Sequence, residues 1–161
     1  MSDLRITNVE TAVVGNPWKP WVFIKLDTNK GVSGYGEATY RPHQDLVTTI
    51  ETVEDDIMGM DPFETEKLFT PRSPLSIKTG PHHGRHMSVL SGLDIAMWDL
   101  KGKYLDVPIY ELLGGAVHGR QIRTYANGWY TNIYEDGERK PELFANAAEG
   151  VVAKGYDALK F

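Results

Sequence analysis

Residues 89–115 read Val-Leu-Ser-Gly-Leu-Asp-Ile-Ala-Met-Trp-Asp-Leu-Lys-Gly-Lys-Tyr-Leu-Asp-Val-Pro-Ile-Tyr-Glu-Leu-Leu-Gly-Gly, and this stretch decides the fold. Its first half predicts a long helix over roughly 86–103, because apolar residues recur at helical spacing on one wide face: Val89, Leu90, Leu93, Ala96, Met97 and Leu100. Pro108 predicts the start of one further helical turn, and Gly114-Gly115 predicts its end.

Three stretches upstream of this helix are rich in β-branched residues, namely 5–14, 21–28 and 32–39. Asn29-Lys30-Gly31 is typical of a tight turn between the last two, so we predict a three-stranded antiparallel meander. A second helix is indicated between the sheet and the long helix by four apolar residues at helical spacing, Leu46, Ile50, Val53 and Ile57. A third helix is predicted to begin at Asp61-Pro62-Phe63-Glu64, which combines a capping acid with an early proline and glutamate.

The pattern changes after Gly115. A short strand is expected at 121–126, a helix from Pro141 to near Gly155, and another strand at 156–161. Strand, helix and strand in this order predict a βαβ unit with parallel strands. Two parallel strands cannot bury both of their faces alone, so we expect this chain to be the N-terminal part of a longer protein.

The composition indicates a globular protein, since 41% of the 161 residues are hydrophobic and 24% are charged. The net charge of −5 argues against a nucleic-acid partner, which requires a basic surface. The absence of cysteine excludes disulfides and thiolate chemistry, and it fits a cytoplasmic location. No apolar run is long enough to predict a membrane span or a membrane partner.

The 89–115 stretch resembles the N-terminal domain of the mandelate racemase and muconate lactonizing enzyme group of the enolase superfamily. The matching runs in it are Ser91-Gly92-Leu93-Asp94, Lys101-Gly102-Lys103 and Leu112-Leu113-Gly114, with Ala96, Asp99 and Pro108. Gly34-Tyr35-Gly36-Glu37-Ala38 is similar to the third strand of that domain, and 154–160 to the run into the second barrel strand. Val89 departs from the usual alanine.

The resemblance implies an α+β capping domain over residues 1–118, followed over 119–161 by the first βαβ unit of a (β/α) TIM-type barrel. Chemistry in such barrels lies at the carboxyl ends of the strands. Family members bind Mg²⁺ through three carboxylates from later strands, so we expect the metal ligands beyond Phe161, no metal site within the chain and no activity from the chain alone. Family members are often homo-oligomers, and we expect the same here.

Within the family, the chain looks most like the sugar-acid dehydratases, the galactonate, gluconate and mannonate group. The main reason is that Tyr125-Ala126-Asn127-Gly128 is similar to a run in the mannonate dehydratase branch. The implied reaction is Mg²⁺-dependent dehydration of an aldonate in carbohydrate catabolism. A base removes the proton α to the carboxylate, an enediolate forms, and loss of the β-hydroxyl leaves a 2-keto-3-deoxy acid. Racemases, epimerases and cycloisomerases share this capping domain and remain alternatives, as does a non-catalytic truncated module that serves folding or assembly.

Two candidate residues belong to the barrel segment. Lys160 ends the second barrel strand, where the family often places a lysine that acts as a base or neutralises developing charge. The alternative for Lys160 is a strand-end lysine without a chemical role. Asn127 follows the first barrel strand and is a candidate substrate contact, whereas Tyr125 could face either the barrel interior or its mouth.

The capping domain contributes further candidates. His82, His83 and Arg85 precede or begin the long helix, and family loops at this place contact the substrate. His82, His83 and His86 form a histidine cluster that could bind a metal ion. Zinc sites usually have a fixed helical spacing and a carboxylate partner, and neither is clear here, so a polar loop is the better interpretation.

Trp18 and Lys19 lie in the loop that the family uses as a lid over the active site. Packing against the sheet is the alternative for Trp18 and the preferred interpretation for Trp21. We expect structural or solvated roles for five charged residues of the family motifs: Glu37, Asp94, Asp99, Lys101 and Lys103.

Overall fold

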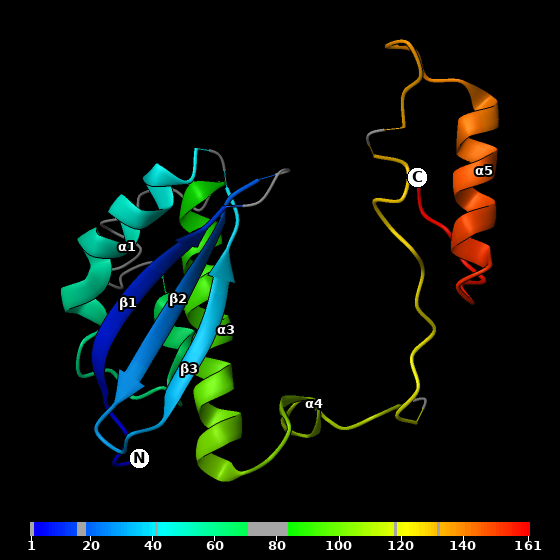
Figure 1. Ribbon diagram of the computed structural model, residues 1–161. Coiled ribbons are helices and arrows are strands. Elements are labelled where there is room, and N and C mark those ends of the chain that lie inside the picture. The colour runs from blue at the N-terminus through cyan, green and yellow to red at the C-terminus, as the bar shows by residue number, and fades with distance from the viewer. Residues whose placement is uncertain (1, 16–18, 41, 71–83, 118, 132) are drawn as a thin grey trace. The chain divides into compact units, whose positions relative to one another are not determined.

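A computed structural model describes residues 2–15, 19–40, 42–70, 84–117, 119–131 and 133–161. The chain divides into two compact units, Met1–Gly115 and Ala116–Phe161, which are described separately below (Figure 1).

The first unit contains the predicted antiparallel meander. Its strands are β1 (Ile6–Val14), β2 (Trp21–Thr28) and β3 (Ser33–Ala38), in the order β1-β2-β3. The register places Ile24 of β2 opposite Thr11 of β1 and Gly36 of β3. Alternate residues of β2 are therefore buried, as expected for a sheet with one face on a core.

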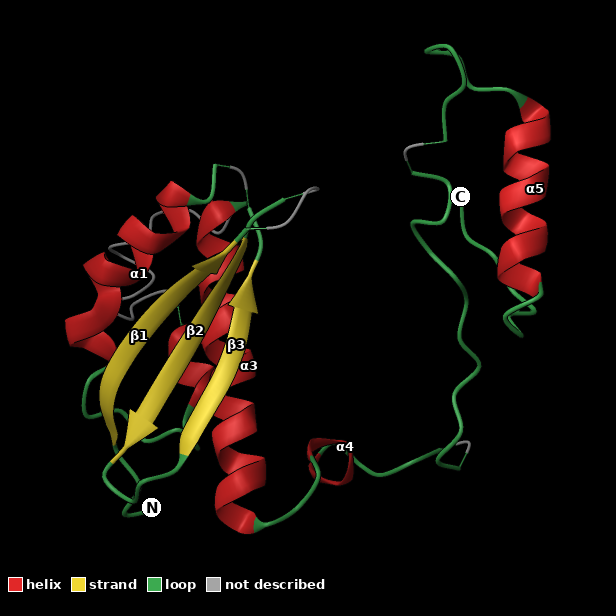
Figure 2. Ribbon diagram, viewed as in Figure 1, coloured by secondary structure: helices red, strands yellow, loops and turns green. Residues whose placement is uncertain are grey.

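Helices α1 (Gln44–Ile57) and α3 (Arg85–Leu105) confirm the two apolar patterns read from the sequence (Figure 2). The predicted stripe of α1 is buried, and so are the six apolar residues predicted on α3. Both helices cover the same face of the sheet (Figure 1), and the core lies between them and the inward residues of β2, Val22, Ile24 and Leu26. The short helix α4 (Ile109–Leu112) follows Pro108, as expected.

Glycines allow α3 to approach β3 with no side chain between the two backbones. A Cβ on Gly36 would lie 2.0 Å from the carbonyl oxygen of Gly92, and a Cβ on Gly34 would lie 2.2 Å from that of Ala96. Real Cβ atoms do not approach an oxygen so closely, so these two strand positions require glycine. The glycines of the 34–38 run therefore serve packing.

Two motif residues of α3 bind the free edge of β3. The Asp99 carboxylate accepts a hydrogen bond from the backbone N–H of Tyr35 at 2.8 Å. Lys103 donates to the carbonyl of Ser33 at 3.0 Å and to Asp99 at 2.6 Å. These contacts satisfy edge groups that have no neighbouring strand, which gives Asp99 and Lys103 structural roles.

The helix predicted to begin at Asp61 is shorter than expected. Within residues 61–70, only one 3-10 turn forms, η1 (Thr65–Leu68), and it starts four residues after Asp61. The Asp61 carboxylate accepts from the N–H of Phe63 at 3.0 Å and from the Ser2 hydroxyl at 2.7 Å, and it pairs with Arg5 at 3.4 Å. The capping acid therefore anchors the N-terminal segment instead of beginning a longer helix.

The second unit contains α5 (Pro141–Val152), which begins at the predicted proline. Its predicted apolar stripe is half-buried: Leu143, Phe144, Ala147 and Val151. The strands expected at 121–126 and 156–161 are reduced to a single parallel bridge between Ala126 and Leu159. A parallel ladder gains stability from neighbouring strands, and the described part of this unit supplies none.

No helix among the described residues is long and apolar enough to cross a membrane.

Candidate functional site

The parallel bridge brings together the two residues of the second unit that are predicted to be functional. Ala126 donates its N–H to the carbonyl of Ala158 at 2.9 Å, and Lys160 donates its N–H to the carbonyl of Ala126, also at 2.9 Å. Ala126 and Leu159 are partners in this register, so Asn127 and Lys160 each follow the bridge by one residue. Both residues therefore lie just past the same end of the bridge, at one edge of it.

The hydrogen bonds of Asn127 fix the orientation of its amide. Its Oδ1 accepts from the backbone N–H of Gly128 at 2.9 Å and from the Tyr130 hydroxyl at 3.2 Å. A backbone N–H can only donate, so the atom facing Gly128 must be the oxygen. The Nδ2 group of this exposed side chain is thus directed away from both contacts and is suited to donate to an acceptor.

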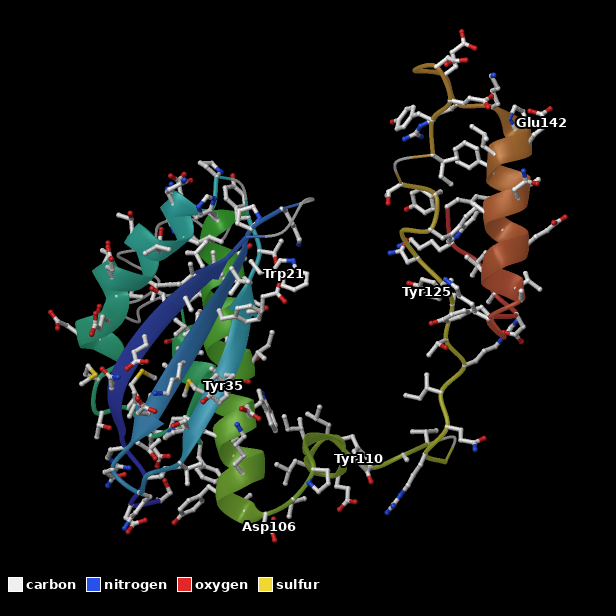
Figure 3. All side chains as sticks on the ribbon, viewed as in Figure 1. Trp21, Tyr35, Asp106, Tyr110, Tyr125 and Glu142 are labelled. Atoms are coloured by element: carbon white, nitrogen blue, oxygen red, sulfur yellow. The ribbon has the colours of Figure 1, made fainter. Side chains whose placement is uncertain are left out.

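Lys160 is held through both its backbone and its side chain. Its carbonyl accepts from Trp129 Nε1 at 3.0 Å, and its ammonium lies 5.8 Å from the centre of the Tyr125 ring. A cation at this distance is weakly attracted to the face of an aromatic ring. Tyr125, labelled in Figure 3, is 55% exposed, and Lys160 is itself an exposed residue.

An aromatic cluster supports this edge, and no motif in the sequence indicates it. Trp129 meets Tyr130 edge-to-face at 5.7 Å between ring centres and Phe161 at 5.8 Å. The only signal in the sequence is that Trp129 and Tyr130 directly follow the Asn127-Gly128 turn. The contact of Trp129 with Lys160 depends on the bridge, which sequence periodicity does not reveal.

The candidates of the first unit form a separate group. Arg85 begins α3, and its guanidinium pairs with Asp45 in the first turn of α1 at 2.9 Å. This pair is more than a third exposed at both partners, so it orients Arg85 but contributes little to stability. Lys19 is half-buried in the segment that leads into β2. Trp18, His82 and His83 lie outside the described residues.

Trp21 does not pack in the core. It lies on β2 facing away from the helices, is 38% exposed, and contacts Phe23 edge-to-face at 6.2 Å (Figure 3). Trp21 therefore packs on the outer face of the sheet, against Phe23, and not on the face that covers the core. The cause is the strand register, which directs Val22 and Ile24 inward and their neighbours outward.

Lys101 and Asp94 of α3 form a partly buried polar cluster. The Lys101 ammonium lies 3.9 Å from the centre of the Trp98 ring and donates to Thr65 Oγ1 at 3.2 Å. Burial lowers the pKa of Lys101 and raises that of Asp94, while the attraction between the two charges opposes both shifts. The cluster joins α3 to η1 inside the first unit, in line with a structural role.

The described residues contain no group of three or more histidine or acidic side chains that could hold a metal ion. Mg²⁺ prefers several oxygen ligands in octahedral geometry. The described residues therefore do not fit a magnesium centre.

Comparisons with known proteins identify the family. Residues 3–114 match the N-terminal domain of mandelate racemase / muconate lactonizing enzyme. The chain is 32% identical to a D-xylonate dehydratase of Haloferax volcanii, over 99% of this chain and 37% of that protein. It is 37% identical to a D-gluconate dehydratase of Thermoproteus tenax, over 87% of this chain and 27% of that protein.

A crystal structure of an enolase superfamily member from Salmonella Typhimurium agrees with the fold. Its TM-score is 0.80 at 32% identity, and the match covers 97% of this chain and 41% of that one. The chain thus spans about a third of the length of the curated relatives named above. It belongs to the mandelate racemase and muconate lactonizing enzyme family of the enolase superfamily, and it contains that family's N-terminal capping domain.

Proposed function

We propose that this chain is the N-terminal part of a hydro-lyase that dehydrates an aldonate, a sugar acid with hydroxyls on the carbons next to its carboxylate. The main support is that relatives matching 87% or more of the chain are named dehydratases of xylonate and gluconate. In the proposed reaction a base removes the proton next to the carboxylate. The hydroxyl on the following carbon leaves as water, and the enol product becomes a 2-keto-3-deoxy acid.

The geometry at the bridge suits two steps of this reaction. Asn127 has an amide N–H available to donate, which fits a carboxylate or hydroxyl oxygen of the substrate. Lys160 places a cation one residue past the bridge, where it would stabilise negative charge on the substrate or, when neutral, accept the proton. Segment 119–161 would then be the first βαβ unit of the barrel, whose strand ends carry the chemistry.

The capping-domain candidates would select the substrate. Arg85 and Lys19 are cations that fit an anionic sugar acid, and Trp18, His82 and His83 complete the proposed set of substrate contacts. A divalent cation would stabilise the extra negative charge that develops on the carboxylate during proton removal. Because the described residues do not fit it, its ligands would come from elsewhere in the complete protein.

The test is to screen the complete protein, with Mg²⁺, against a library of aldonates and aldarates for formation of 2-keto-3-deoxy acids. We expect dehydration of at least one aldonate and its loss on chelation of the metal. Lys160→Met and Asn127→Ala should each lower kcat/KM for that substrate at least tenfold, by the usual size of acid–base and charge-assisted contributions. Racemisation or cycloisomerisation of an acid with no dehydration would replace this proposal with another reaction of the family.

A further inference from the structure

We infer that Trp129 and Tyr130 are positioning residues for the candidate site, Tyr130 acting on Asn127 and Trp129 on Lys160. The inference rests on the proposed function, but it concerns two residues that no family motif in the sequence indicates. The observation behind it is that two consecutive aromatic side chains donate one hydrogen bond each to the two functional candidates.

Tyr130 helps to hold the Asn127 amide in one orientation. An asparagine amide can rotate by half a turn and exchange its donor for its acceptor with almost no change in shape. Here the N–H of Gly128 can only donate, so it selects the rotamer with Oδ1 turned toward it, and the Tyr130 hydroxyl donates to the same oxygen and reinforces that rotamer. That rotamer presents two N–H donors outward, and the ligand group it selects is an oxygen acceptor of an acid or alcohol.

Trp129 connects the turn after Asn127 to the end of the second extended segment. Its indole N–H donates to the Lys160 carbonyl at 3.0 Å, and its ring packs on Tyr130 and Phe161. Trp129 and Tyr130 are half-buried, although most residues of this unit are exposed. The aromatic pair therefore holds the backbone from which the Lys160 side chain projects, and it couples that backbone to the Asn127 turn.

The experiment uses the complete protein and the aldonate found in the library screen. Tyr130→Phe keeps the ring and removes only the hydroxyl, so we expect KM to rise about fivefold with kcat nearly unchanged. In an Asn127→Ala background the same substitution should leave KM within about 1.5-fold, because the group it orients is gone. Tyr134→Phe is the matched control, since the Tyr134 hydroxyl in this unit contacts Arg139 instead.

Trp129→Phe supplies the second arm, because it keeps an aromatic ring and removes the N–H donor. We expect kcat to fall about fivefold with little change in KM, the opposite division from Tyr130→Phe. Thermal unfolding of each variant separates positioning from folding, since a purely structural effect would lower the melting temperature along with the activity.

Two results would overturn the inference while leaving the proposed function intact. One is a Tyr130→Phe effect of equal size in the wild-type and Asn127→Ala backgrounds, which would mean that Tyr130 does not act through Asn127. The other is an unchanged kcat in Trp129→Phe. A protein that dehydrates no aldonate would refute the proposed function and this inference together.

Discussion

Gly36 illustrates at the scale of one residue how little space separates α3 from the sheet. Replacing it with alanine puts a methyl group against the Gly92 carbonyl, so strand or helix backbone must move. We expect Gly36→Ala to reduce the free energy of unfolding by about 2 kcal/mol, as for overpacked cores. Gly15→Ala is the control, because nothing lies within 4 Å of its added Cβ. Equal urea midpoints for the two variants would contradict the close approach.

Asp27 makes the stability of the sheet depend on pH. Hydrogen bonds from Ser33 and Asn8, followed by Lys25, lower the pKa of Asp27 to about 2. Because this value lies below the ordinary one of 3.8, the stabilisation is complete above about pH 4 and disappears as the pH falls toward 2. Solvent screening limits the effect to about 1 kcal/mol.

The pH dependence is measured by urea unfolding between pH 5 and 2. Asp27→Asn should lose less stability than the wild type over this range, since it has no carboxylate to protonate at this position. Glu51→Gln, on an exposed position of α1, serves as the control for removing one negative charge. Parallel curves for the wild type and Asp27→Asn would show that the Asp27 contacts do not stabilise the fold.

At the scale of elements, the Lys101–Asp94 cluster attaches η1 to α3 through the hydrogen bond from Lys101 to Thr65. Lys101→Met removes the cation but keeps most of the packing on Trp98, and it leaves Asp94 partly buried without its counter-charge. We expect a loss of about 2–3 kcal/mol in unfolding free energy. The double variant Asp94→Asn, Lys101→Met should recover at least half of it, because neither charge remains. Additive losses in this cycle would exclude a coupled pair.

The elements also show which parts of the fold the sequence can predict. Helices α1 and α3 follow from apolar spacing alone, because each buries one complete stripe. The longer helix expected from Asp61 does not form, because Ser2 and Arg5, from a distant part of the chain, bind the Asp61 carboxylate. The strand expected at 121–126 forms only one bridge, because a parallel strand depends on its neighbours as much as on its own residues.

The sequence likewise indicates some residues of the candidate site and not others. Asn127 and Lys160 were predicted from the family resemblance, and the bridge between Ala126 and Leu159 explains why they lie at one edge. The sequence does not indicate Trp129 and Tyr130, because an aromatic residue after a turn has no fixed partner in sequence. Only the pairing of segments far apart in the chain brings the Trp129 indole to the Lys160 carbonyl.

At the scale of the whole molecule, we propose that the described capping domain is completed by a barrel. A barrel of about 250 residues added to this cap predicts a native product of roughly 40 kDa. The intact mass of the protein isolated from its own cells measures this directly. A native mass of 18.1 kDa would instead support a non-catalytic module and remove the basis for the proposed dehydratase.

The contact of Asp99 with the edge of β3 has a consequence for how copies of this protein behave at high concentration. An unpaired strand edge can recruit a strand from another molecule and start aggregation. Here a carboxylate and an ammonium from the protein's own helix occupy the Tyr35 and Ser33 backbone groups that such a strand would need. Asp99→Ala should therefore increase light scattering on storage more than it lowers the melting temperature, since it opens a template while leaving the core intact.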